Sequence, residues 1–207
     1  MTFLMALDYG SVFIFALTGA LVASRAQLDV IGFVFVASLT AVGGGTIRDV
    51  ILNRDVVFWV ENPMIIGVAA AAAVLVFFTA HLLESRARSI IWLDAVALAV
   101  AVPAGVGVAL SMDQPQAIVI IMGITTGSFG GLMRDVVCNE VPLVLRQGEL
   151  YVTCAFAGAA SALVALQLGL TRPESLLVCA AATFVLRAGS IAFGWRLPVY
   201  KSFPPRN

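Results

Sequence analysis

Long apolar runs separated by short polar breaks dominate the pattern along the chain. Each run has about the 20 mostly apolar residues that a helix needs to cross the hydrocarbon core of a membrane. The runs lack strict alternation and are too long for barrel strands, and helices satisfy their own backbone polar groups in lipid, so we predict helices. The predicted spans are Phe3–Ala23, Leu28–Ile47, Pro63–Leu82, Ile90–Leu110, Pro115–Met133, Leu150–Leu170 and Glu174–Gly194.

Composition agrees with an integral membrane protein. The chain is 61% apolar and 12% charged, whereas soluble domains are about 45–50% apolar and about 25% charged. Its 12 basic and 12 acidic residues cancel, so a nucleic-acid partner, which needs a basic excess, is not expected. We therefore predict an all-α membrane protein of seven transmembrane helices, folded as a single membrane domain.

The basic residues of the short loops predict the orientation. Arg187 lies inside the last span and is not counted; we expect it to face protein and to pair with a carboxylate that the sequence does not identify. Loops rich in Lys and Arg stay in the cytoplasm, which predicts an external N-terminus and a cytoplasmic C-terminus. One face carries Arg25, Arg86, Arg88, Arg134, Arg146, Arg196, Lys201 and Arg206, and the other only Arg48, Arg54 and Arg172.

The chain also matches itself at an offset of 86 residues. We therefore predict a three-helix repeat over residues 1–86, a second over 87–172, and a seventh helix with a tail over 173–207. Three spans are an odd number, so the second repeat enters the membrane from the opposite face, as in many transport proteins. The matches are Leu7-Asp8 with Leu93-Asp94, Gly19 with Gly105, Gly44-Gly45 with Gly130-Gly131, Arg48-Asp49-Val50 with Arg134-Asp135-Val136, and Asn53 with Asn139.

Glycine clusters near the ends of the second and fifth spans are the strongest local feature. Gly43, Gly44 and Gly45 stand in the second span, and Gly130 and Gly131 in the fifth. Glycine weakens a helix by about 1 kcal/mol relative to alanine, which favours a kink or an unwound turn whose carbonyls could bind a partly dehydrated cation. The alternative is close helix packing, because small residues recur at every fourth position there.

A basic–acidic pair follows each glycine cluster. Neighbouring residues of a helix point about 100° apart, so we expect Arg48 to face Asp135, and Arg134 to face Asp49, across the axis that relates the repeats. Ionisable residues inside membranes usually mark a pathway. The alternative is that both arginines extend to the lipid headgroups as ordinary anchors.

Further polar residues are weaker candidates. Asp8 and Asp94 stand near the starts of the first and fourth spans, where a helix N-cap is the favoured role and the concentration of cations at two mouths is the other. Thr46 and Ser128 could supply hydroxyl ligands to an ion, although hydroxyls bonded back to their own helix are commoner. Transient potassium or sodium is expected near the glycines, without a tightly bound metal or a cofactor.

Searches for enzyme motifs find none. The sequence contains no P-loop, no G-x-G-x-x-G and no H-E-x-x-H motif, and its one histidine leaves no plausible nucleophile–base pair. We therefore do not expect an enzyme.

Taken together, the inverted repeats, the seventh span and the doubled G-G-x-x-R-D resemble the trimeric intracellular cation (TRIC) channels in their prokaryotic branch. The resemblance implies a homotrimer in a bacterial inner membrane, with a monovalent-cation pore in each subunit between the kinked spans two and five. Arg48, Asp49, Arg134 and Asp135 match the charged motif of that family. Animal members resemble K-E-V-x-R in the second repeat, but the second basic position here is Cys138; this argues against phosphoinositide binding, although Arg134 could still meet a lipid phosphate.

Three functions follow from the sequence. The first is a passive channel for potassium and sodium. Because the same broad domain occurs in bacterial proteins described as glycine transporters, the second is a carrier for glycine or another small zwitterion, whose carboxylate could meet a broken helix end or an arginine. A scaffold subunit without transport is the third.

Overall fold

The computed structural model describes residues 3–82, 86–146, 150–198 and 200. All regular elements within these residues are helical, so the predicted all-α fold is confirmed. The elements are α1 (Phe3–Arg25), α2 (Val30–Ile51), α3 (Phe58–Glu61), α4 (Met64–Thr79), the 3-10 turn η1 (Ala80–Leu82), α5 (Arg86–Ser111), α6 (Gln116–Val137), the 3-10 turn η2 (Leu143–Leu145), α7 (Tyr151–Gln167) and α8 (Arg172–Phe193).

Six described helical segments are long and apolar enough to cross a membrane, and α7 is apolar but shorter. The predicted spans correspond to these seven segments, with one systematic difference. α2 and α6 continue past the apolar runs and include Arg48-Asp49 and Arg134-Asp135, which the pattern had placed at the loops. The helices continue because these charges find partners inside the helical bundle.

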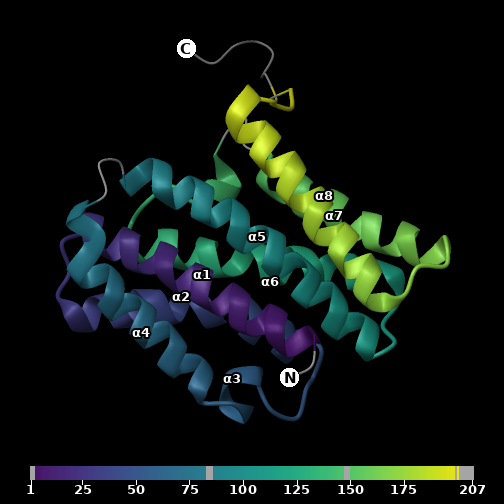
Figure 1. Cartoon of the computed structure of the whole chain (residues 1–207), viewed down its shortest axis with the longest axis horizontal. Coiled ribbons are helices and arrows are strands. Elements are labelled where there is room, and N and C mark those ends of the chain that lie inside the picture. The colour runs from purple at the N-terminus through teal and green to yellow at the C-terminus, as the bar shows by residue number, and fades with distance from the viewer. Residues whose placement is uncertain (1–2, 83–85, 147–149, 199, 201–207) are drawn as a thin grey trace.

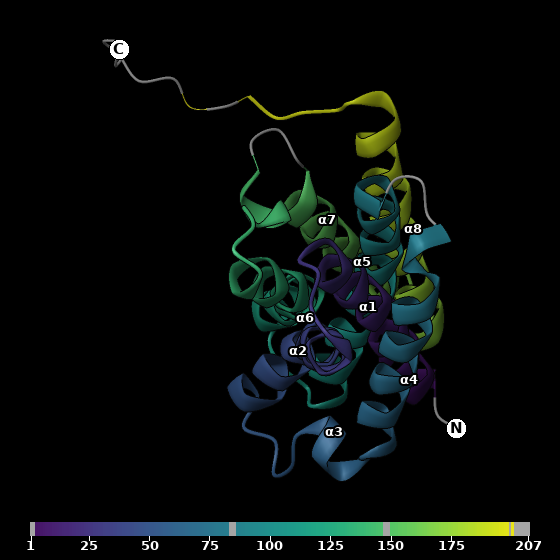
Figure 2. The ribbon, with the colours of Figure 1, turned by 90° about the vertical axis from the view of Figure 1, so that its left-hand side faces the viewer.

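Two three-helix groups form most of the molecule (Figure 1). α1 packs on α2 and α4, while α5 packs on α6 and α7, and α8 covers α5 and α7. The two groups meet where α1 lies on α5 and α2 on α6. In Figure 2, α3 lies at the bottom of the molecule, whereas the green segment between α6 and α7 lies near the top, as inverted repeats require.

The repeat is also visible in the backbone. Among the described residues, four that are not glycine have positive φ angles: Gln27 (54°), Asn53 (51°), Asp113 (50°) and Asn139 (55°). They form two pairs at the offset of 86 residues, Gln27 with Asp113 and Asn53 with Asn139. Each lies just after a long helix, where a left-handed residue ends the helix and satisfies its last carbonyls. The duplication therefore extends from the sequence to the helix ends; the domain boundaries at residues 86 and 172 stay a prediction.

The glycine clusters let α2 and α6 touch. A Cβ atom on Gly44 would meet the Thr126 carbonyl oxygen, and a Cβ on Gly130 would meet the Thr40 carbonyl oxygen, which is the same contact made twice. Both helices are α-helical throughout the clusters, so an unwound turn is wrong, while a kink of the helix stays a prediction. Packing against the partner helix outweighs the weak helix propensity of glycine, and close packing, the alternative, explains Gly44 and Gly130.

This contact predicts opposite effects for two glycine substitutions. Gly130→Ala places a methyl group against the Thr40 carbonyl and should lower the free energy of unfolding by about 1–3 kcal/mol. Gly67→Ala on α4 has nothing within 4 Å of the new Cβ and should raise it by about 0.5–1 kcal/mol. Thermal unfolding in detergent measures both, and equal midpoints for the two variants would contradict the contact.

Candidate functional site

Each repeat contains a buried arginine held by two carboxylates. In the first repeat, Arg48 Nε donates a hydrogen bond to Asp49 Oδ1 at 2.7 Å, and Arg48 Nη1 donates to Asp8 Oδ1 at 3.1 Å. Arg48 and Asp49 are fully buried, whereas the Asp8 side chain is 18% exposed. The Arg48 guanidinium also lies over the Phe58 ring, 5.3 Å from its centroid. We call Arg48, Asp8 and Asp49 the first triad.

The second repeat builds the same arrangement. Arg134 Nε donates to Asp135 Oδ1 at 2.8 Å, and Arg134 Nη1 donates to Asp94 Oδ1 at 3.0 Å. Arg134 Nη1 also donates to Thr18 Oγ1, on α1 of the first repeat, at 3.0 Å. Asp94 is fully buried here. We call Arg134, Asp94 and Asp135 the second triad.

The expected pairing across the repeat axis is therefore wrong. Arg48 does not pair with Asp135 but with its own neighbour Asp49, and Arg134 likewise pairs with Asp135. A long arginine side chain can fold back far enough to span the angle between adjacent helical residues, so the directions of the Cβ atoms do not decide the partner. The arginines are also not headgroup anchors, because both are buried inside the protein.

Asp8 and Asp94 do not cap helices, so the favoured interpretation of these two residues is wrong as well. Both lie inside α1 and α5, beyond the first turn, where their backbone groups already take part in the helix. Their carboxylates are instead the second partners of Arg48 and Arg134. A buried guanidinium needs such partners, since an unpaired charge in the interior is expensive.

The remaining oxygen of each motif aspartate holds the segment that follows. Phe58 N donates to Asp49 Oδ2 at 2.8 Å, and Leu143 N donates to Asp135 Oδ2 at 2.9 Å. These bonds fix α3 and η2 on the two triads. Sequence reasoning missed them, although the repeated Asn53 and Asn139, which turn the chain back after each helix, were a signal for a shared loop structure.

The two candidate hydroxyls differ. Thr46 Oγ1 donates to Val42 O at 2.7 Å and accepts a bond from Trp59 Nε1 at 2.9 Å, so it bonds back to its own helix, as the commoner alternative had it. Ser128 Oγ is buried and has no hydrogen-bond partner among the described residues. Arg187 on α8 is buried and faces protein as expected; its guanidinium lies over the Tyr151 ring, 5.2 Å from the centroid.

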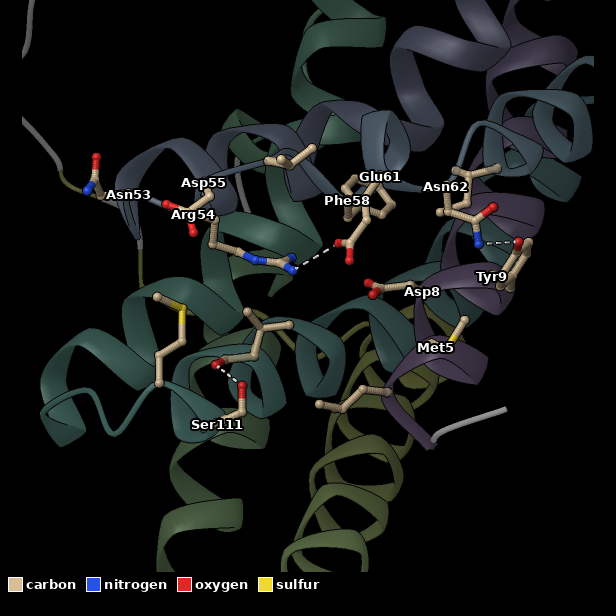
Figure 3. A pocket seen from close by; sticks show the side chains of 15 residues that line it. Met5, Asp8, Tyr9, Asn53, Arg54, Asp55, Phe58, Glu61, Asn62 and Ser111 are labelled. Atoms are coloured by element: carbon tan, nitrogen blue, oxygen red, sulfur yellow. Dashed lines mark hydrogen bonds and ion pairs between the residues drawn. The ribbon is translucent and has the colours of Figure 1, made fainter.

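A wide cavity opens beside the first triad (Figure 3). Its volume is about 880 Å³, and we call it the vestibule. Asp8 lines it together with the charged residues Arg54, Asp55 and Glu61. Arg54 donates to Asp49 Oδ2 at 3.2 Å and to Glu61 Oε2 at 3.4 Å. Since three of the four charged lining residues are acidic, the vestibule carries more negative than positive groups.

The cavity beside the second triad is much smaller, about 30 Å³. Arg134 and Asp135 line it, but Asp94 does not. The two ends of the repeated structure therefore have the same triad and very different access to it.

The chain matches a family model described as Glycine transporter twice, over residues 5–81 and 91–167, which are again offset by 86 residues. A UPF0126 membrane protein of Vibrio cholerae is 36% identical over 90% of this chain and 78% of its own. The UPF0126 inner membrane protein YadS of Escherichia coli K12 is 34% identical over 94% of each chain. The chain therefore belongs to the family whose model is described as Glycine transporter, and these UPF0126 membrane proteins are its relatives. With these relatives and its apolar helices, it is a membrane protein.

Solved structures of the family's relatives agree with the fold. The trimeric intracellular cation channel orthologue from Rhodobacter sphaeroides is 42% identical, with a TM-score of 0.90 over 94% of this chain and 100% of that chain. Another TRIC cation channel is 27% identical, with a TM-score of 0.85 over 98% of each chain. The resemblance to the prokaryotic TRIC channels is confirmed.

The burial of the triads predicts unequal costs for their outer carboxylates. Asp94→Asn removes a charge partner from a fully buried guanidinium and should cost about 3–5 kcal/mol of the free energy of unfolding. Asp8→Asn should cost less, because water reaches the partly exposed Asp8. Asp113→Asn is the control, since its exposed pair with Arg172 contributes at most about 1 kcal/mol. Chemical unfolding in detergent gives the three values, and an Asp94 variant as stable as the Asp113 variant would contradict the buried triad.

Proposed function

We propose that the protein is a passive channel for monovalent cations, with potassium and sodium as the permeant ions. Two findings support this proposal: membership of a family whose solved relatives are described as cation channels, and the charge of the two triads. Those relatives are channels rather than enzymes, and we assign this chain to the same class.

The charge balance of the triads is the observation that carries the proposal. Each triad contains two carboxylates and one guanidinium. Its net charge of −1 favours a passing cation and disfavours an anion. Because both arginines donate their hydrogen bonds to carboxylates, their positive charge is neutralised and does not repel the ion. Arg48, Asp49, Arg134 and Asp135 therefore act as the neutralising and gating groups, and Asp8 and Asp94 as the acidic groups of the two mouths.

The proposed path runs from the vestibule past Asp8, along the α2–α6 contact, to Asp94. Gly43, Gly44 and Gly130 lie in this contact, whereas a Cβ on Gly45 would meet Phe58 and a Cβ on Gly131 would come nearest to Asp94. Thr46 and Ser128 supply hydroxyl oxygens beside the path. The backbone contact at Gly44 and Gly130 represents a closed arrangement, so conduction requires α2 and α6 to part. Potassium or sodium would occupy the path only transiently.

We extend the proposal to assembly and location. Relatives are described as trimeric channels and as inner membrane proteins, which supports a homotrimer in a bacterial inner membrane, with one pore in each subunit and lipid bound around it. The basic loops favour an external N-terminus and a cytoplasmic C-terminus.

A carrier for glycine or another small zwitterion is the second candidate. The observation that favours it is the unequal access to the triads, since a wide cavity at one end and a nearly closed one at the other is the arrangement that alternating access requires. The description of the family model points the same way.

Recording from purified protein in a planar bilayer separates these functions. A channel gives unitary potassium currents without any substrate, and a carrier gives saturable uptake of labelled glycine into vesicles without unitary currents. If the vestibule concentrates cations, Asp8→Asn should lower the unitary conductance roughly twofold at low salt, and the difference should shrink above about 1 M salt, where charges are screened within about 3 Å.

Asp29→Asn is the matched control for the conductance measurement. Asp29 caps α2 through the Gly32 amide and does not line the vestibule, and asparagine is an equally good cap. Its conductance should equal that of the unchanged protein. Glycine uptake without unitary currents would reject the channel and leave the carrier.

A further inference from the structure

The repeat supplies every part of the triad twice, yet the two mouths differ. The vestibule beside the first triad has a volume of about 880 Å³, and the cavity beside the second has about 30 Å³. The side chain of Asp8 is 18% exposed, whereas its counterpart Asp94 is fully buried. Something outside the repeated residues must therefore close the second mouth.

The first difference is a reversal of charge directly after the repeated Asn53 and Asn139. Arg54 follows in the first repeat, and Glu140 stands at the corresponding place in the second. Arg54 folds back onto Asp49 at 3.2 Å. Glu140 cannot do the same, because its carboxylate would approach Asp135 with a like charge. It extends away from the triad instead.

Glu140 finds its partners on two other segments. Arg25 Nη2 lies 3.3 Å from Glu140 Oε1, and Arg146 Nη2 lies 3.9 Å from Glu140 Oε2. Arg25 is the last residue of α1, in the first repeat, while Arg146 follows η2 in the second. The ion pairs therefore connect the two repeats, and all three residues line the small cavity together with Arg134 and Asp135.

The corresponding positions of the first mouth cannot form these ion pairs. The residue that corresponds to Arg25 is Ser111, and the one that corresponds to Arg146 is Val60. Ser111 lines the open vestibule. The ion pairs around Glu140 and the closure thus occur at the same mouth.

We propose that Arg25, Glu140 and Arg146 form an ionic latch that holds the mouth of the second triad closed, and that release of the latch admits water to that triad. The inference rests on the proposed pathway between the repeats, but it holds for a channel and for a carrier alike. The latch side chains are 24–40% exposed, so the latch is weak and sensitive to salt. Such a contact suits a mouth that opens and closes readily.

The experiment measures the access of a thiol reagent to the small cavity, without any transport. Ile91 lines this cavity, so Ile91→Cys is the reporter, in a chain whose Cys138, Cys154 and Cys179 are replaced by serine or alanine. A charged methanethiosulfonate reagent is added to the purified full-length protein in detergent at low salt. Adding Glu140→Gln should increase the rate of modification roughly two- to fivefold, the range that corresponds to one exposed ion pair.

Two controls make the result specific. Asp113→Asn breaks the exposed pair with Arg172, away from the cavity, and should leave the rate of the Ile91→Cys reporter unchanged. A second reporter, Ser111→Cys in the open vestibule, should react at the same rate with and without Glu140→Gln. In the protein with the intact latch, raising the salt should increase the rate of modification of the Ile91→Cys reporter toward the rate in the Glu140→Gln variant.

A double substitution tests the pairing itself. Arg25→Gln alone should increase the rate of modification, and Arg25→Gln together with Glu140→Gln should increase it no further than Glu140→Gln alone, because both remove the same ion pair. An unchanged rate in Glu140→Gln, or an equal increase in Asp113→Asn, would overturn the latch. Because the readout is thiol access, a protein that passes no current but still shows the latch effect would reject the channel alone, whereas a conducting protein without the effect would reject the latch alone.

Discussion

A guanidinium inside a membrane protein is stable only when carboxylates surround it, and this constraint organises the structure. The cost of an unpaired buried charge is several kcal/mol, so Arg48 and Arg134 fix the positions of everything that neutralises them. Asp8 and Asp94 bring α1 and α5 to the ends of α2 and α6. Through their second oxygens, Asp49 and Asp135 also hold α3 and η2. Each triad therefore joins three separate segments of its repeat.

The sequence identified the six residues of these triads but neither their grouping nor their pairing. The offset of 86 residues identified all six charged residues, because a duplicated charge in an apolar chain stands out. The predicted partners were wrong because they followed from the directions of adjacent helical residues, whereas the reach of the arginine side chain decides the contact. The N-cap interpretation of Asp8 failed although the predicted span begins at Phe3, as α1 does. Asp8 lies inside the helix, and its carboxylate pairs with Arg48, a contact that the pattern of one helix does not reveal.

The glycine clusters show that the sequence predicted the helices of the fold better than the contacts between them. Hydropathy located the helices well but not all of their ends, since α2 and α6 continue past the apolar runs. Glycine propensity predicted kinks or unwound turns, and no turn is unwound, because propensity is a weak influence when another backbone lies against the residue. The carbonyls of Thr40 and Thr126 occupy the space that Cβ atoms would need. Small residues at every fourth position indicated close packing, but not which backbone lies against them.

The pairing within each repeat has a consequence for opening. If Arg48 had paired with Asp135, parting α2 from α6 would have broken a buried ion pair and left charges exposed to a low dielectric. The ion pairs of both triads instead lie within one repeat, and in the described part of the chain the contact that Arg134 makes across the repeats is a hydrogen bond to the neutral Thr18. At Gly44 and Gly130 the α2–α6 contact consists of glycine against backbone, and one side chain of α6, Met133, packs on Gly43. The two helices can therefore separate while every guanidinium keeps its carboxylates, so the cost of opening falls on weak contacts such as the Arg25–Glu140 pair rather than on the triads.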